Sequence, residues 1–108
     1  GCFLMYPQEL ATAVQHQANL IILVSNNGTY GTIRMHQERR YPGRVVATDL
    51  RNPDFVALAR SFGAHAELVE TTDAFPEAFM RASKARLPAV LELRVDPAHA
   101  VLLVDGIA

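Results

Sequence analysis

Apolar positions in the first part of the chain follow two different spacings. Between residues 7 and 18 they recur every three to four residues, which predicts a helix. The run 20–24 is continuously apolar and has the length of a strand, which is typical of a strand buried on both faces of a parallel sheet. Polar residues follow this run, and the segment 31–38 is then expected to form a short helix with Ile33 and Met35 directed inward.

A third helix is predicted after a long irregular loop that runs to Asn52. Asn52 is a residue type that caps helices, and Pro53 follows it at the first helical position. Gly63 ends the apolar pattern and is expected to end the helix. The inward stripe of this helix contains Phe55, Val56, Leu58, Ala59 and Phe62.

The last third of the chain predicts a strand, a helix and another strand. The first strand covers 64–69, the helix starts at Thr72 or Asp73, and the final strand covers 87–95 and closes at an Asp-Pro pair. The inward face of the helix is predicted to be Phe75, Ala78, Phe79 and Ala82. Strands that alternate with helices in this way indicate βαβ units.

The fold class that follows is α/β, with an open, mainly parallel sheet and helices on both faces. No repeat, low-complexity tract or linker interrupts the order of elements, so we expect a single domain over 1–108. Within it, residues 98–108 form an apolar tail that the alternation of helices and strands does not explain.

Composition narrows the classes of function. The chain has 108 residues, of which 50% are hydrophobic, and a formal net charge of -1, which describes one soluble globular unit. Its basic residues are dispersed, so nucleic acid is not an expected partner. No apolar run approaches the roughly 18 residues of a membrane span, so a membrane is not expected either. A single cysteine permits no internal disulfide, and we expect a cytoplasmic location.

Side chains with candidate chemistry gather directly after the first predicted strand. The segment 26–31 contains two asparagines, a threonine and two glycines. Ligands of open α/β sheets bind outside the carboxyl ends of the strands, and amide and carbonyl oxygens suit a hard cation that carries a phosphate group. The alternative is a turn in which the two amides cap backbone groups. The four histidines lack the close spacing of a zinc site.

Four short segments, 8–10, 26–31, 54–59 and 88–89, arrive in an order that resembles a known family. The chain is similar to the C-terminal cofactor-binding domain of thiamine diphosphate-dependent enzymes related to acetolactate synthase and benzoylformate decarboxylase. That domain carries a Gly-Asp-Gly turn, a helix, a buried strand and then Asn-Asn. Gly1 stands where the last glycine of the turn would be, so we expect an incomplete thiamine diphosphate-binding fold, truncated at its N-terminal side.

The resemblance also implies a set of binding residues. The magnesium ion would take the side-chain oxygen of Asn27 and the backbone carbonyl of Thr29, while the aspartate that supplies a third ligand has no counterpart here. The diphosphate would meet backbone amides at two helix starts, and the implied cofactor-binding residues are Gly1, Cys2, Asn27, Thr29, Tyr30 and Gly31. Cys2 departs from the serine often found at its position. No catalytic residue is implied.

The function implied is that of a fragment of a 2-keto acid decarboxylase or acetolactate synthase-like enzyme that contributes the magnesium-diphosphate site. The glutamate that activates the cofactor comes, in the family, from a pyrimidine-binding domain of a partner subunit. We therefore expect no catalysis by this chain alone and assembly into a homo-oligomer. The alternatives are a noncatalytic oligomerisation or binding module with a decayed cofactor site, and an α/β phosphate-binding protein unrelated to the family.

The tail suggests one further hypothesis. Residues 101–106 read as an apolar strand that ends in Asp-Gly, which is the pattern missing before Gly1. Such a strand, from the same chain or from a second copy, would occupy the empty position in the sheet. It would place Asp105 near Asn27 as a substitute ligand. The alternative is a tail that covers exposed core or mediates a dimer.

Overall fold

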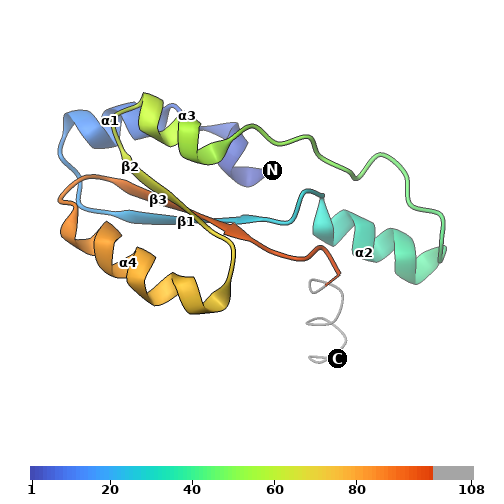
Figure 1. Cartoon of the computed structure of the whole chain (residues 1–108). Coiled ribbons are helices and arrows are strands. Elements are labelled where there is room, and N and C mark those ends of the chain that lie inside the picture. The colour runs from blue at the N-terminus through green and yellow to red at the C-terminus, as the bar shows by residue number, and fades with distance from the viewer. Residues whose placement is uncertain (99–108) are drawn as a thin grey trace. The chain divides into compact units, whose positions relative to one another are not determined.

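Within the described residues the sheet has three strands in the order β1-β3-β2, so the last of them along the chain lies at its centre (Figure 1). The strands are β1 (Ile21–Asn26), β2 (His65–Val69) and β3 (Ala89–Arg94). They belong to a computed structural model that describes residues 1–98. Because a crossover connects each strand to the next, the chain returns past the sheet before it adds β3 between the other two.

The strands run parallel, as predicted. β2 pairs in parallel with β3 along its whole length. On the other side of β3, the amide of Ala89 donates to Leu20 O at 2.9 Å and the amide of Val95 donates to Asn26 O at 3.1 Å. Both partners advance by the same number of residues in the same direction, which is the pattern of a parallel ladder.

Helices lie on both faces of the sheet (Figure 1). Helices α1 (Glu9–Gln15) and α3 (Phe55–Ser61) cover one face, and α4 (Phe75–Lys84) covers the other. Short 3-10 helices precede α1 and α4, at Cys2–Met5 (η1) and Thr72–Ala74 (η2). The predicted α/β fold with an open parallel sheet and helices on both faces is therefore confirmed.

Alternate side chains of β3 fill two separate apolar layers. Val90 packs on the side of α1 and α3, whereas Ala89 and Leu91 pack on the side of α4. All three side chains are fully buried. The helices approach the sheet through small residues, since Ala59 of α3 and Ala82 of α4 are also almost completely buried. This period-two burial follows from the pleat of the strand.

The chain divides into two compact units. The first contains residues 1–25 and 53–94, and the described part of the second contains 26–52 and 95–98. The second unit holds helix α2 (Gly31–Arg40) and the segment that follows it. The tail hypothesis, including Asp105, falls on residues outside the described part of the chain. None of the helices within residues 1–98 is long and apolar enough to cross a membrane.

The prediction that the run 20–24 is buried on both faces was wrong. Only Val24 of β1 is buried, and Leu23 is 49% exposed to solvent. In the sheet of the described residues β1 is an edge strand, and it is β3 that is buried on both faces. A continuous apolar run does not distinguish an edge from a centre, because the number of neighbouring strands is set by the topology.

The helix start at Asn52 was also placed wrongly. The carboxylate of Asp54 accepts the amide of Ala57 at 2.8 Å, so Asp54 is the cap and α3 begins at Phe55. Asn52 instead donates its side-chain amide to Asn26 Oδ1 at 2.8 Å. Both asparagine and aspartate are good caps, and they flank the same proline here, so composition alone does not choose between them.

Two residues predicted to face inward are exposed. Ile33 is 54% exposed while Met35 is buried, because residues two apart on a helix point about 200° apart and do not share a face. Phe79 is 42% exposed and contacts the ring of Phe75 at 5.7 Å between centroids. The predicted stop at Gly63 is confirmed, since this residue follows α3 in a left-handed conformation that favours glycine.

The cap at Asp54 gives a direct test of where α3 begins. Asp54→Ala removes the acceptor for the Ala57 amide and should destabilise the chain by about 1 kcal/mol. Asp73→Ala is the matched control, because Asp73 is exposed and lies in the first turn of η2 without being its N-cap. Thermal unfolding followed by circular dichroism measures both. Equal midpoints for Asp54→Ala and the parent chain would contradict this assignment.

The central position of β3 predicts unequal effects of two leucine truncations. Leu91→Ala leaves a cavity in a fully buried layer and should lower the free energy of unfolding by about 3 kcal/mol. Leu23→Ala, on the half-exposed edge strand, should lower it by about 1 kcal/mol or less. Urea unfolding of the two variants measures the difference. Equal losses would show that the two strands are buried to the same extent.

Candidate functional site

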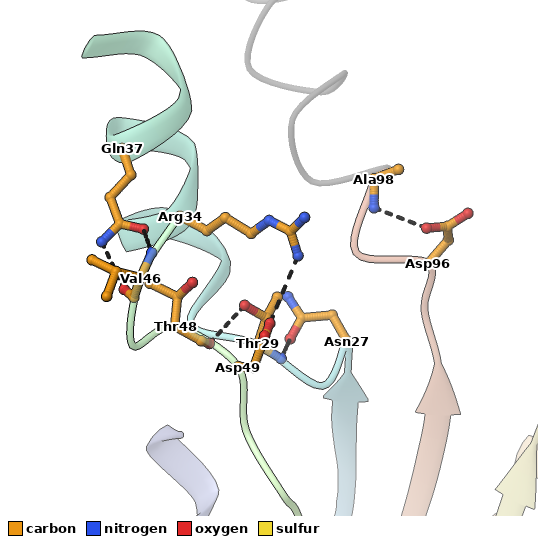
Figure 2. Close-up of polar contacts among 9 residues, drawn as sticks. All are labelled: Asn27, Thr29, Arg34, Gln37, Val46, Thr48, Asp49, Asp96 and Ala98. Carbon is orange, nitrogen blue, oxygen red and sulfur yellow. Dashed lines mark hydrogen bonds and ion pairs between the residues drawn. The ribbon is translucent and has the colours of Figure 1, made fainter. Parts of the chain in front are cut away.

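The polar turn that follows β1 is built from two successive side-chain to backbone hydrogen bonds. Asn26 Oδ1 accepts the amide of Gly28 at 3.1 Å. Asn27 Oδ1 accepts the amide of Thr29 at 3.2 Å, as Figure 2 shows. Gly28 has φ +65°, a conformation that few other residues adopt. Each asparagine thus stabilises the backbone two residues ahead, which is the usual role of this residue in turns.

An isolated antiparallel bridge joins this turn to a later segment of the same unit. Thr29 pairs with Asp49, and the flanking bonds run from Leu50 N to Gly28 O and from Tyr30 N to Thr48 O, both at 2.8 Å. These bonds use the carbonyl of the residue before Thr29 and the amide of the residue after it. The bridge therefore does not engage the carbonyl of Thr29.

The carbonyl of Thr48 accepts a second hydrogen bond from the turn. Thr29 Oγ1 donates to Thr48 O at 2.7 Å (Figure 2). Both threonines are buried, with 5% and 2% of their surface exposed. Hydrogen bonds to a buried carbonyl hold the turn more firmly than exposed hydrogen bonds would, because water does not compete for the carbonyl oxygen.

Helix α2 begins directly after the turn. Tyr30 is its N-cap and Gly31 its first residue. The first amides of a helix have no intrahelical partner, and the helix dipole places partial positive charge at this end. The amide of Tyr30 donates to Thr48 O, so the amides available for an anion start at Gly31. Arg39 and Arg40 lie in the last turn, where the dipole favours positive charge.

The four predicted residues after β1 are therefore brought together on one turn. Asn27, Thr29, Tyr30 and Gly31 lie in sequence between the end of the strand and the start of α2. Among residues 1–98, no cluster of three His, Cys, Asp or Glu side chains could hold a metal ion. A divalent ion at this turn would be held by amide and carbonyl oxygens, together with oxygens of its ligand.

The other two predicted residues belong to the first unit. Gly1 precedes η1 and accepts the amide of Leu4 at 3.1 Å, and Cys2 is an exposed free cysteine. Cys2 lines a mostly apolar cavity of about 300 Å³ together with Phe3, Tyr6, Glu9, Leu10, Ala13, Leu20 and Ile22. The structure therefore groups the predicted residues into a pair in one unit and a turn of four residues in the other.

Charge near the turn is balanced locally. The Arg34 guanidinium lies 3.9 Å from the carboxylate of Asp49, and the two side chains are 36% and 89% exposed (Figure 2). Such an exposed pair contributes little to stability. Its effect is to place one positive and one negative side chain beside the start of α2.

Sequence reasoning missed two residues that support the turn, Thr48 and Gln37. The segment that contains Thr48 was predicted only as an irregular loop. The apolar residues beside Thr48 were the one sequence signal that this residue is buried. Gln37 falls within the segment 31–38, which the sequence predicts only as a short helix. Its observed partner is the backbone of Val46 in the same chain.

Comparison with known sequences places this architecture among one group of enzymes. The sequence profile described as "Thiamine pyrophosphate enzyme, C-terminal TPP binding domain" matches residues 1–93. The chain is 34% identical over 105 residues to a probable acetolactate synthase large subunit of Methanocaldococcus jannaschii, a match that covers 96% of this chain and 18% of that protein. It is 34% identical over 96 residues to acetolactate synthase of Bacillus subtilis, covering 89% and 17%.

Solved structures agree with the sequence comparisons. Benzoylformate decarboxylase from Polynucleobacter necessarius superposes with a TM-score of 0.79 at 27% identity, covering 88% of this chain and 18% of that one. The thiamine diphosphate-dependent 4-hydroxybenzoylformate decarboxylase of Rhodococcus jostii gives 0.73 at 33% identity, covering 81% and 16%. The chain thus spans less than a fifth of the proteins it matches. It belongs to the thiamine pyrophosphate enzymes and corresponds to part of their C-terminal cofactor-binding domain.

Proposed function

We propose that this chain supplies the magnesium-diphosphate binding turn of a thiamine diphosphate-dependent enzyme of the acetolactate synthase or 2-keto acid decarboxylase type. One observation carries the proposal. The side-chain oxygen of Asn27 and the carbonyl of Thr29 lie on one buttressed turn that leads directly into the N-terminus of α2. A cation-bound diphosphate needs this combination of oxygen ligands and backbone donors.

The donor chemistry of the turn fits the cofactor's metal. Mg²⁺ prefers oxygen ligands and usually retains phosphate or water oxygens alongside a few protein ligands. Asn27 Oδ1 accepts one hydrogen bond, at 3.2 Å, and an amide oxygen has a second lone pair for a metal ion. The carbonyl of Thr29 is left free of the bridge. Asn27 and Thr29 would hold the ion, and the amide of Gly31 would meet a phosphate oxygen.

The residues of this chain bind and orient, and they do not carry out the reaction. When bound, thiamine diphosphate supplies the nucleophilic carbon that attacks a 2-keto acid and stabilises the carbanion left after loss of carbon dioxide. The chain's contribution is to fix the diphosphate end. By resemblance, the activating glutamate belongs to a pyrimidine-binding domain of a partner subunit, so the chain alone is proposed to be inactive.

Assembly and location form part of the same proposal. An edge strand such as β1, with Leu23 half exposed, invites pairing with another chain. We propose a homo-oligomer located in the cytoplasm. Light scattering at micromolar concentration should give at least twice the 11.9 kDa mass of the chain. A mass of one chain would contradict the oligomer.

Calorimetric titration of thiamine diphosphate tests the binding function. We expect binding in the presence of magnesium and its loss with a chelator, because Asn27 and Thr29 would hold the ion, which would neutralise charge on the diphosphate. Asn27→Ala should weaken binding at least about tenfold, the loss of one ligand-type contact of about 1.4 kcal/mol. Asn19→Ala, at an exposed asparagine just before β1, is the matched control and should bind like the parent chain.

The same titration separates the proposal from its alternative. No heat at millimolar cofactor, with or without magnesium, would favour a noncatalytic oligomerisation or binding module whose site has decayed. Binding by the parent chain that Asn27→Ala does not change would show that the cofactor is held elsewhere. In either case the 2-keto acid turnover of the isolated chain, measured as release of carbon dioxide, should remain at background.

A further inference from the structure

We infer that Gln37 is a positioning residue for the magnesium-diphosphate turn, which it holds through the return segment 46–50. This inference rests on the proposed function. Gln37 lies two turns into α2, well separated in sequence from Asn27 and Thr29. Its effect is transmitted by a series of hydrogen bonds within the second unit, most of which are visible together in Figure 2.

The carboxamide of Gln37 clamps both backbone groups of one residue. Gln37 Nε2 donates to Val46 O at 2.9 Å, and Val46 N donates to Gln37 Oε1 at 3.3 Å. A primary amide that pairs with an N–H and a C=O at once mimics a strand neighbour and fixes the orientation of the peptide as well as its position. Val46 is 68% exposed, so packing contributes little to holding this residue in place. The clamp is therefore its main restraint.

The next residue shows that the segment is held under strain. Ala47 has φ +56°, in the left-handed region that is unfavourable for a residue with a Cβ atom. A conformation of this kind persists only where the surrounding contacts fix it. Here Val46 is fixed on one side by Gln37, and Thr48 is fixed on the other side by the turn.

Thr48 passes the restraint to the turn through its carbonyl. Thr48 O accepts both Thr29 Oγ1 and Tyr30 N, and Leu50 N adds a bond to Gly28 O. These three bonds enclose the residue whose carbonyl is proposed to bind the ion. Thr29 N in turn bonds to Asn27 Oδ1, so the second proposed ligand is oriented by the same contacts. Release of Val46 would allow Ala47 to relax and would move the acceptor on which both ligands depend.

The test is to remove the clamp without shortening the side chain. Gln37→Met has similar length and no amide, and Gln15→Met, at an exposed glutamine in α1, is the matched control. Hydrogen exchange of the backbone amides of Tyr30 and Leu50, followed by NMR, reports the state of the turn. We expect exchange at these two amides to become about tenfold faster in Gln37→Met, with the amide of Leu91 in β3 unchanged.

Binding provides the second readout. Magnesium-dependent affinity for thiamine diphosphate, measured by calorimetry, should fall about tenfold in Gln37→Met and not in the control. Unchanged exchange at Tyr30 and Leu50 would overturn the inference whether or not the cofactor binds. Faster exchange with parental affinity would overturn the positioning role alone. Failure of the parent chain itself to bind would overturn the proposed function, and the positioning role for that site with it.

Discussion

The burial of β3 on both faces is the constraint on which the rest of the structure depends. A central strand of a parallel sheet needs a neighbour on each side and a helix on each face, and each of these elements is provided by a different part of the chain. Because β1 and β3 run in the same direction, their carboxyl ends finish together. Polar residues that follow β1 therefore leave the sheet at the edge where open α/β folds bind ligands.

A second constraint operates where the strand ends, since a turn that is to bind an ion must keep some oxygens free while its other polar groups are satisfied. In the turn after β1, donor groups are satisfied by a backbone carbonyl of the later segment that pairs with the turn. Thr48 O takes the amide of Tyr30 and the hydroxyl of Thr29, which leaves the carbonyl of Thr29 outside the bridge. The hydrogen-bonded groups define the geometry, and the carbonyl of Thr29, which the bridge does not engage, is one of the two oxygens proposed to bind the metal.

The sequence predicted the α-helices and strands of the described part, but not the short 3-10 helix η1, because most of these α-helices and strands carry an apolar pattern that is bounded by turn residues. It did not predict which strand is central, since the run 20–24 is more apolar than β3 and yet lies at an edge. Around the site, Asn27 and Thr29 were predicted as candidate ligands because they lie close together in one short segment. Gln37 and Thr48 were not, because their importance lies in hydrogen bonds to backbone groups, which any residue type could supply at the partner position.

The proposed ligand set would also have a thermodynamic consequence for cofactor binding. Asn27 and Thr29 offer two protein oxygens, whereas Mg²⁺ requires near-octahedral coordination. Most of its positions would then be filled by diphosphate and water, so the ion gains little from the turn until the diphosphate is present. Each ligand would raise the affinity for the other by the same factor, as linkage requires. A buttressed turn would raise the affinity for the ion and the diphosphate together, because a turn that is already ordered loses less conformational entropy when they bind.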